Sequence, residues 1–572
     1  MTAALHLSAQ GPVIRTPYAP APVGAVNPYS YIEAGTMIAS QGVEAVSVDG
    51  RGNCITGVRD GGWIKVGEVD FGDVPPRTAT VETFNFKGRG RIDFCLDRPD
   101  NAPIAGMDIL GEYPVKISDV TGDVSGKHDL FIVFSGGEGE LFSFDWWKFN
   151  VTVNMPVIQT KYTADPAPMV YDGTVYLYTT HDADDSGRGF SMFDWLLYSS
   201  TDMVNWTDHG QVASLRSFDW YDGDNGAWAL QVTERNGKFY MYCPIHGHGI
   251  GVLVADSPYG PFTDPLGEPL VWQREHWEDI DPTVFVDDDG QAYMYWGNPN
   301  VYWVTLNEDM ISYSGEIHKL DYKIDDYQEG PWFYKRDGHY YLAFASTCCP
   351  EGIGYAMSDS PTGPWKAMGD IMRHTQRTRG NHPGIIDYKG RSYVFGLNYD
   401  LMHIETYRHH ERRSVSMAEM HYNPDGTIQE VPYWQDNVIE QLEAFNPYRK
   451  VEAETMALGY GLKTEELPGG GIAINNIDDG EYLLLKGVDF RKRGARRLRM
   501  NVRCGSVPAS VEVRLDAPDG PLAGTLKLKD TRGVFKTRSG RLKGQSGVHD
   551  LYFVFKGDAG KDLFEWDWWR MK

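Results

Sequence analysis

The 572-residue sequence contains no run of eighteen consecutive apolar residues, so it provides no segment that could span a membrane as a helix. Basic residues are scarce as well, because 54 Lys and Arg accompany 79 Asp and Glu, which gives a formal net charge of −25. Nucleic acids and anionic membranes bind to basic surfaces, so this balance argues against both as partners. A neutral polymer is compatible with it.

Cysteine is also sparse, with no Cys-x-x-Cys spacing of the kind that binds metals. The six residues are Cys54, Cys95, Cys243, Cys348, Cys349 and Cys504. The adjacent pair Cys348 and Cys349 cannot form a disulfide with each other without strain. All six are predicted to be free thiols, with no disulfide framework.

The first 24 residues have neither a basic segment nor a continuous apolar one, so they are not a recognisable secretion signal. The protein is therefore expected to be either cytoplasmic or secreted with a leader that lies outside this sequence. Pro17, Pro20 and Pro22 favour a loose N-terminal arm over residues 1–25.

What the sequence does contain is one phrase repeated five times, a turn glycine followed three residues later by a tyrosine. The pairs are Gly173/Tyr176, Gly237/Tyr240, Gly290/Tyr293, Gly338/Tyr341 and Gly390/Tyr393. Asp or Asn precedes four of the five glycines, and such pairs between apolar residues are strong hairpin signals. The copies recur about every fifty to sixty residues, as expected for propeller blades of four strands. Residues 153–442 are therefore predicted to form a five-bladed β-propeller.

Seven or eight residues before each turn lies one residue of the strand that enters the hairpin. These residues are Asp165, Trp228, Asp281, Glu329 and His382. The innermost strand of every blade faces the central channel, so the five side chains are predicted to surround one pocket. A single Asp-Pro pair is more often a surface turn. The three acids share one register, however, and each stands one or two residues before a proline, which favours an active site.

Three carboxylic acids around one axis favour glycoside hydrolysis. Like charges and desolvation raise the pKa of some of them, so one acid stays protonated while another is ionised. Glycosidases need this division, because a protonated acid assists the leaving oxygen while a carboxylate activates water or attacks carbon. The third acid can orient the proton donor.

A longer repeat brackets the propeller. Asn27-Pro28-Tyr29 returns as Asn446-Pro447-Tyr448, and the segment HDLFIVF that begins at His128 returns as HDLYFVF at His549. Short alternating runs separated by turn residues read as strands of a β-sandwich. Two homologous sandwich domains, residues 26–152 and 443–572, are therefore predicted to flank the propeller, and the fold class is all-β.

Residues 155–440 resemble the family 43 glycoside hydrolases, five-bladed propellers that act on xylan- and arabinan-derived sugars. The resemblance rests on Ala164-Asp165-Pro166, Ile280-Asp281-Pro282, Glu329-Gly330-Pro331 and the blade-edge phrases Ala255-Asp256-Ser257-Pro258 and Ser358-Asp359-Ser360-Pro361. It implies that Asp165 is the general base, that Glu329 is the general acid, and that Asp281 tunes and positions Glu329. It also implies inversion of configuration, with the two carboxyl groups roughly 6.5–9.5 Å apart.

The same resemblance implies that Arg413, or its neighbour Arg412, reaches the sugar hydroxyls, and that an ion or water cluster lies on the axis near His382. Trp228 is predicted to be either an apolar wall of the sugar pocket or a core residue between blades. His246 and His248 have the spacing of a metal pair, but no carboxylate cluster accompanies them, so His248 is predicted to line the pocket rim.

The flanking domains resemble family 6 carbohydrate-binding modules, the second one more closely. In that family a Glu-Ala-Glu phrase and a late Asp hold a structural calcium ion. The matching residues of the second domain are Glu452, Glu454 and Asp567. The first domain has Glu33 and Asp145 but Gly35 in place of the second glutamate, which puts its calcium in doubt. No cofactor is expected for the chemistry, and one or both sandwiches can instead be packing partners that shape the active-site rim.

The expected function is that of an inverting exo-glycosidase that releases terminal xylose, L-arabinofuranose or both from xylo-oligosaccharides or arabinoxylan. Two alternatives stay open: an arabinan-degrading hydrolase with an open cleft, and a non-catalytic glycan-binding protein. The presence of all three ring acids favours an enzyme.

Overall fold

The computed structural model describes residues 25–572 except residues 50, 73–74, 77, 111–114, 123, 151–155, 185–188, 348–350, 375–380, 400, 403–411 and 435–437. Apart from residue 25, the predicted N-terminal arm lies outside the described residues, and so do Cys348 and Cys349. The other four cysteines are buried and free, as predicted. The chain divides into two compact units, Met1–Val153 with Met402–His409, and Asn154–Leu401 with His410–Lys572. Within the described segments, no helix is long and apolar enough to cross a membrane.

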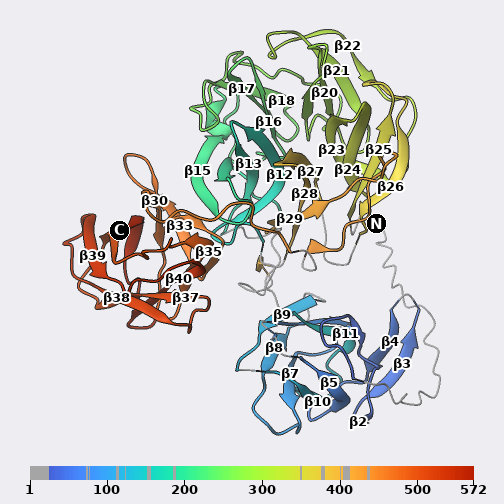
Figure 1. Ribbon diagram of the computed structural model, residues 1–572. Coiled ribbons are helices and arrows are strands. Elements are labelled where there is room, and N and C mark those ends of the chain that lie inside the picture. Colours follow the sequence, from blue (N-terminus) through green and yellow to red (C-terminus); the bar gives the residue numbers. More distant parts are fainter. Residues whose placement is uncertain are drawn as a thin grey trace. The chain divides into compact units, whose positions relative to one another are not determined.

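The first unit contains a sandwich of two antiparallel sheets (Figure 1). Its strands are β1 (Ile32–Glu33), β2 (Ala39–Gln41), β3 (Glu44–Val48), β4 (Gly52–Thr56), β5 (Trp63–Asp70), β6 (Thr78–Phe84), β7 (Gly90–Leu96), β8 (Ala105–Ile109), β9 (Val115–Asp119), β10 (Lys127–Gly136) and β11 (Ser143–Asn150). One sheet has the order β3-β4-β11-β6-β9, with β1 paired to β11, and the other has the order β2-β5-β10-β7-β8. The inward side chains, including fully buried Phe94, Trp147 and Phe149, form the core between the sheets.

The second unit begins with five antiparallel sheets, the blades of a propeller (Figure 1). The first blade contains β12 (Tyr162–Tyr171), β13 (Thr174–Asp182), β14 (Asp194–Ser200) and β15 (Trp206–Ser214), and the short 3-10 helix η1 (Leu215–Ser217) follows it. The second contains β16 (Gln231–Arg235), β17 (Lys238–Pro244) and β18 (Ile250–Ala255), and the third β19 (Thr283–Val286), β20 (Ala292–Trp296), β21 (Tyr302–Leu306) and β22 (Tyr313–Lys319). The fourth contains β23 (Tyr327–Arg336), β24 (His339–Ser346), β25 (Gly352–Ser358) and β26 (Lys366–Met372), and the fifth β27 (Gly384–Tyr388), β28 (Arg391–Asn398) and β29 (Ser414–Met420).

The repeated turn glycines join the first two strands of each blade. In four blades the turn has two central residues, and both have positive φ, for example +45° at Asp172 and +72° at Gly173. That geometry matches the right-handed twist of the flanking strands, and Asp, Asn and Gly tolerate it best. The turn phrase therefore fixes the hairpin register of the first strand in these four blades.

The two ends of the propeller sequence lie side by side and close the ring. The amide of Val157 donates to the carbonyl of Val415 (2.7 Å), and the amide of Thr163 donates to the carbonyl of Arg413 (3.0 Å). Strand β12 also packs against both β16 and β27, the first strands of its two neighbouring blades. Residues near positions 165 and 413 thus become neighbours.

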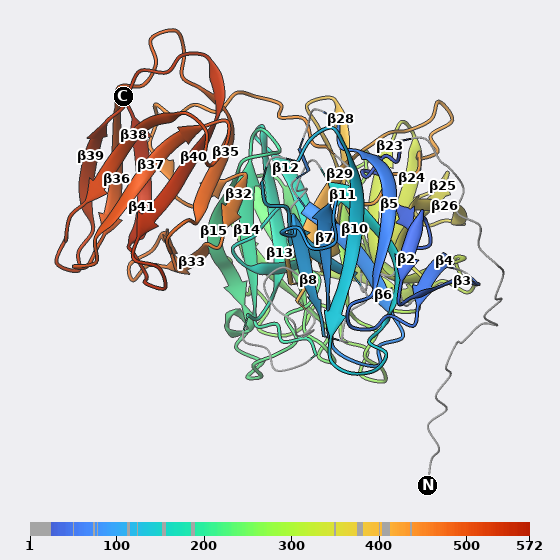
Figure 2. The same cartoon turned by 90° about the horizontal axis from the view of Figure 1, so that it is seen from below.

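The second sandwich, the remainder of the second unit, repeats the topology of the first (Figure 2). Its strands are β30 (Val451–Glu452), β31 (Thr455–Met456), β32 (Leu458–Tyr460), β33 (Lys463–Glu466), β34 (Ile472–Asn475), β35 (Tyr482–Asp489), β36 (Arg497–Arg503), β37 (Ala509–Leu515), β38 (Leu522–Leu528), β39 (Lys536–Arg541), β40 (Val548–Gly557) and β41 (Glu565–Met571). The sheet orders are β33-β34-β41-β36-β39, with β30 paired to β41, and β32-β35-β40-β37-β38. Strand β31 joins the outer edge of the first propeller blade by pairing with β15. The predicted all-β fold, a propeller with two sandwiches, is confirmed.

Candidate active site

The three acids reach the propeller axis through irregular backbone. Asp165 lies in β12 with a φ of +49°, where the pairing with β13 shifts register. Asp281 lies just before β19 with a φ of +57°, and Glu329 lies in β23 between two register shifts. Positive φ is uncommon for residues other than Gly and persists where the surrounding structure holds it, often at active sites. Register shifts re-aim side chains, which brings the acids together.

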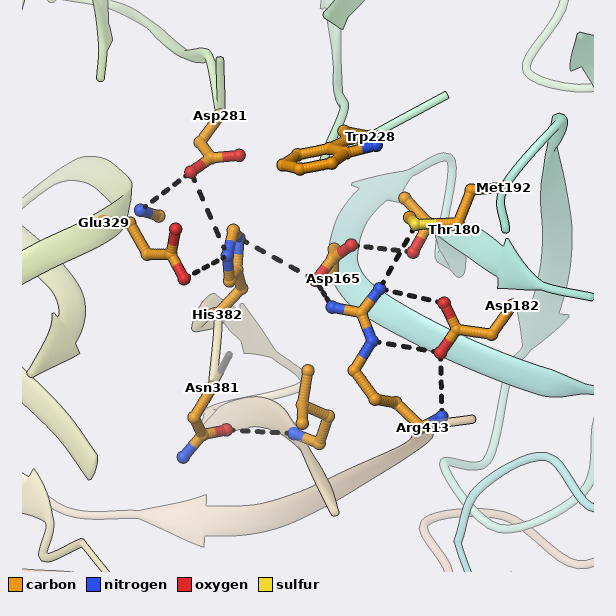
Figure 3. A network of polar contacts seen from close by, with 12 residues as sticks. Asp165, Thr180, Asp182, Met192, Trp228, Asp281, Glu329, Asn381, His382 and Arg413 are labelled. Carbon is orange, nitrogen blue, oxygen red and sulfur yellow. Dashed lines mark hydrogen bonds and ion pairs between the residues drawn. The ribbon is translucent and has the colours of Figure 1, made fainter. Parts of the chain in front are cut away.

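The imidazole of His382 stands among the three acids (Figure 3). Its Nδ1 lies 3.9 Å from Oδ1 of Asp165. Its Nε2 lies 3.6 Å from Oε1 of Glu329 and 3.9 Å from Oδ2 of Asp281. Four of the five residues predicted to surround one pocket therefore lie together, and His382 is the residue that approaches all three acids.

Two further residues hold this arrangement. Asn298 donates a hydrogen bond from Nδ2 to Oε2 of Glu329, and the amide of Gly330 donates to Oδ2 of Asp281 (3.3 Å). Gly330 has a φ of +61°, and a Cβ atom there would lie 2.9 Å from the imidazole of His382. The ring thus packs directly on the backbone that follows Glu329, and only glycine permits this approach.

Burial and repulsion between like charges set the protonation states of the cluster. Burial by itself lowers the pKa of His382, but the carboxyl groups of Asp281, Asp165 and Glu329 raise it to about 10. Burial raises the pKa of Asp281 to about 8, with His382 opposing and Glu329 and Asp165 adding to the shift. Burial thus favours the neutral form of Asp281, whereas the neighbouring carboxyl groups favour the cationic form of His382.

Asp165 belongs to a buried ion-pair network. Thr180 donates from Oγ1 to Oδ2 of Asp165 (2.8 Å), and Nη1 of Arg413 donates to Oδ1 (2.9 Å). Arg413 also donates to Asp182 from Nε (3.0 Å), from Nη2 (2.9 Å) and from its backbone amide (2.8 Å). Asp165, Asp182 and Arg413 are each at most 4% exposed. The guanidinium of Arg413 is thus directed at two carboxylates, so it fixes the orientation of Asp165.

A small cavity of about 20 Å³ lies beside the acids, on the side of the prolines that follow the ring positions. Its lining includes Asp165, Asp281 and His382, together with Pro166, Pro282, Pro331 and Pro383. This volume holds about one water molecule. The cavity is therefore large enough for solvent on the axis and too small for a sugar ring.

Trp228, the ring residue of the second blade, is half-buried and lies near Asp165 and Asp281 (Figure 3). Its ring stacks on His246 with centroids 4.3 Å apart and packs against Phe190 at 6.0 Å. His246 is exposed and in turn contacts Trp277, which is 44% exposed (5.8 Å). Phe190, Trp228, His246 and Trp277 form a partly exposed surface that begins at the acids, and we call it the aromatic surface.

His248, the predicted rim residue, lies beside this surface rather than among the acids. It is exposed, and its Nδ1 is 3.0 Å from the carbonyl oxygen of His246. Its ring packs against Tyr221 (4.9 Å) and Trp272 (5.7 Å).

Several residues of the cluster were not among the sequence predictions. They are Thr180, Asp182, Asn298, Glu351 and Asn381. Glu351 is 2% exposed and accepts a hydrogen bond from the amide of Asn381 (2.6 Å), the residue before His382. Burial, followed by the charge of Glu329, raises the pKa of Glu351 to about 7. None of the five occupies the repeated hairpin register, so the repeat carried no signal for them.

The predicted calcium residues of the second sandwich form a separate acidic group. Glu454 is 5% exposed, and its Oε2 is buried without a hydrogen-bond partner among the described residues. Oδ2 of Asp567 accepts a hydrogen bond from Asn501 (2.7 Å), and Oε1 of Glu452 accepts one from Lys450 (2.8 Å). Burial raises the pKa of Glu454 to about 9.

Comparison with known proteins agrees with the geometry. The profile of glycosyl hydrolases family 43 matches residues 153–428, and that of the family 6 carbohydrate binding module matches residues 33–151 and 452–572. An arabinoxylan arabinofuranohydrolase of Paenibacillus polymyxa is 34% identical over 73% of this chain and 74% of its own length. One of Bacillus subtilis is 32% identical over 73% of this chain and 91% of its own length. A xylosidase/arabinosidase of Bacteroides ovatus is 30% identical over 48% of this chain and 95% of its own length.

Among solved structures, the family 43 arabinoxylan arabinofuranohydrolase of Bacillus subtilis in complex with cellotetraose has a TM-score of 0.66 and 32% identity. The alignment with that structure covers 73% of this chain and 97% of the chain in the Bacillus subtilis structure. A propeller with three axial acids and two sandwiches that match the family 6 carbohydrate binding module defines a carbohydrate-active hydrolase. The chain belongs to glycoside hydrolase family 43, which confirms the predicted family and the predicted enzymatic class.

Proposed function

We propose that this glycoside hydrolase is an inverting α-L-arabinofuranosidase that removes arabinofuranosyl groups from arabinoxylan and its oligosaccharides. The proposal is supported by how much of this chain aligns with each relative. The relatives named arabinoxylan arabinofuranohydrolase align over 73% of the chain, well beyond residues 153–428, whereas the xylosidase/arabinosidase aligns over 48%. Release of terminal xylose is the second candidate, because that shorter relative carries both activities in its name.

We assign Asp165 as the general base. Thr180 and Arg413 each donate to one of its oxygens, so the carboxylate has a fixed orientation. A carboxylate has about four acceptor positions, which leaves two for a water molecule. This water gives a proton to Asp165 while its oxygen bonds to the anomeric carbon and the glycosidic C–O bond breaks.

We assign Glu329 as the general acid, which transfers its proton to the departing glycosidic oxygen. Asn298 holds Oε2 of Glu329, and Oε1 lies 3.6 Å from Nε2 of His382. Burial raises the pKa of Asp281 to about 8, which favours its neutral form and so limits the negative charge beside Glu329 as the proton leaves. Asp281 is thus assigned the tuning and positioning of Glu329.

The positions of base and acid relative to His382 support inversion. Asp165 faces Nδ1 and Glu329 faces Nε2 of the same imidazole, so the two carboxyl groups lie on different sides of one ring. Inverting glycosidases need such a separation, because a water molecule must fit between the base and the sugar. His382 is assigned the role of a cationic spacer between them.

The aromatic surface supports a substrate that extends beyond one sugar. Trp228 is assigned as a wall of the sugar pocket, and Trp277 lies further out, where it is 44% exposed. Aromatic rings pack on the apolar faces of sugars. An arabinofuranosyl group attached to a polymer needs contacts of this kind for the chain that carries it. His248, beside the surface, is assigned to its rim.

None of these steps uses a metal. Ligand atoms of Asp281, Glu329 and His382 lie within 4.8 Å of one another. Calcium takes about six to eight oxygen ligands, and this group offers two carboxyls and a nitrogen that is protonated at neutral pH, so it fits calcium poorly. Glu452, Glu454 and Asp567 fit better, because a buried oxygen of Glu454 has no hydrogen-bond partner among the described residues. A calcium ion there would be structural and would hold β30 to β41.

The test is to incubate the enzyme with arabinoxylan, linear xylo-oligosaccharides and linear arabinan, and to measure released arabinose and xylose by chromatography. We expect arabinose from arabinoxylan, and a fall in kcat of about 10²–10⁴-fold in Glu329→Gln. Glu316→Gln, at an exposed glutamate of β22, is the matched control and should leave kcat unchanged. Xylose as the first product would favour the second candidate, and binding of arabinoxylan without turnover would refute the proposal.

A further inference from the structure

The two sandwiches carry different charges at one equivalent corner. This corner lies where the first short strand pairs with the last strand, β1 with β11 and β30 with β41. In the first domain the amide of Ala34 donates to the carbonyl of Asp145 (2.7 Å), and in the second that of Ala453 donates to the carbonyl of Asp567 (2.9 Å). The backbones correspond, so the side chains can be compared position by position.

Three exchanges distinguish the two corners. The first exchange lies eighteen residues after Glu33 and Glu452, in the turn between β3 and β4 and in the turn between β33 and β34. The first domain has Arg51 there, and the second has Gly470. The second exchange lies on the neighbouring strand. Glu82 is paired with Trp146 in the first domain, and Asn501 is paired with Trp568 in the second. Two residues after the first glutamate stand Gly35 and Glu454.

In the first domain the guanidinium of Arg51 joins the acids. Its Nη1 donates to Oε1 of Glu82 (2.8 Å) and also to Oδ2 of Asp145. Its Cζ lies 4.6 Å from the ring centre of Phe84, and Nε1 of Trp146 donates to the other oxygen of Glu82 (2.9 Å). Glu82 and Asp145 are 5% and 4% exposed, so both carboxylates are buried and both are paired with this one cation.

The first corner also lacks space for the missing ligand. A Cβ atom on Gly35 would lie 2.8 Å from Cβ of Asn53, so a glutamate cannot be placed there without moving that strand. Glu33, the remaining family ligand, accepts a hydrogen bond from Nδ2 of Asn53 (2.7 Å). The residues present therefore do not fit a metal ion.

The second corner is the opposite case. Gly470 supplies no side chain, and Asn501 supplies a neutral donor to Asp567 where the first domain has a charged network. Glu454 keeps a buried oxygen without a hydrogen-bond partner among the described residues. A buried polar oxygen without a partner is costly, and an oxygen-liganded cation at this corner would supply the missing partner.

We propose that Arg51 is a built-in replacement for a divalent cation. The first sandwich is closed at this corner by a guanidinium and binds no metal there, whereas the second requires an added oxygen-liganded cation such as calcium. The statement about the second domain rests on the calcium site proposed above, and the statement about Arg51 does not.

The test is hydrogen exchange, followed by mass spectrometry on the full chain in chelator and in excess calcium. Chelation should speed exchange of peptides from β30 and β41 by about tenfold or more and leave β1 and β11 unchanged. Equal responses in the two domains, or a response of β11 to calcium, would overturn the proposal. If β41 does not respond to calcium, the calcium site of the second domain is wrong, and the Arg51 variants then decide the first domain alone.

Arg51→Met should speed exchange of β11 in chelator and in calcium alike, because the corner has no ligand set with which calcium could substitute. Arg51→Lys keeps the charge and should show a smaller effect, and it replaces the first variant if that one does not fold. Arg59→Met, at an exposed arginine of the same domain, is the matched control. Unchanged exchange of β11 in Arg51→Met would show that Arg51 does not close the corner.

Discussion

Replacing Arg413 by methionine separates the two roles of the buried network. The change removes the three hydrogen bonds that the Arg413 side chain donates to Asp165 and Asp182, and it leaves two carboxylates that are at most 4% exposed without the guanidinium. Only the backbone amide of residue 413 can still donate to Asp182. Breaking a buried ion pair by removing one partner costs about 3–5 kcal/mol. In a domain of this size such a loss lowers Tm by on the order of 10 °C.

The assay is a thermal scan of the full chain, with wild type and Arg413→Met side by side, combined with the pH dependence of kcat/KM. Asp165 keeps the hydrogen bond from Thr180 but loses the positive charge of Arg413 at 2.9 Å, and only the more distant His382 remains as a cation beside it. The acidic limb of the profile should therefore move to higher pH. In Arg413→Met/Asp182→Asn one buried charge is gone, so part of the Tm should return while the acidic limb stays displaced. A decrease in Tm of less than 1 °C, or an acidic limb that does not move, would show that Arg413 neither stabilises the fold nor supports the ionised form of Asp165.

Three further predictions concern the axial cluster and its rim. Asp281→Asn replaces a carboxyl group whose pKa is raised to about 8 with a permanently neutral side chain. Activity at pH 6 should therefore survive in part, and the alkaline limb of the pH profile should move to higher pH. Complete loss of activity at pH 6 would show that Asp281 acts as an anion. Gly330→Ala should lower kcat by about 10–100-fold, because the added Cβ atom displaces the imidazole of His382. In addition, a residue other than glycine at a φ of +61° adds about 1 kcal/mol or more of backbone strain. Unchanged kinetics would contradict the packing of His382 on Gly330. Trp228→Ala should raise KM for arabinoxylan more than for a nitrophenyl arabinofuranoside, and an equal change for both would place the tryptophan at the scissile sugar alone.

Much of the fold followed from the sequence because two repeats encode it. Each turn glycine fixes a hairpin locally, and the residue that enters the hairpin keeps the same place in every blade, so symmetry alone brought Asp165, Asp281, Glu329 and His382 together. The sandwiches followed in the same way from their shared phrases.

The supporting residues could not be predicted in this way. Asp182 meets Arg413 across 231 positions only because the two ends of the propeller lie side by side. Asn298 and Glu351 lie outside the repeated register, so their approach to Glu329 and Asn381 depends on how each blade is closed. Arg51 lies in a turn, and nothing in the surrounding sequence indicates that its guanidinium binds Glu82 and Asp145. Only the folded structure brings these distant carboxylates beside it.

If Asp165 activates water while Glu329 protonates the leaving group, the anomer of the sugar that is released first must be inverted. Wild-type enzyme would be mixed with a nitrophenyl α-L-arabinofuranoside in an NMR tube, and the anomeric proton signals followed before mutarotation equilibrates them. We expect β-L-arabinofuranose to appear first, because water attacks the face opposite the leaving group. Initial formation of the α anomer would mean that a carboxylate attacks carbon directly, and it would contradict the assignment of Asp165 as a base.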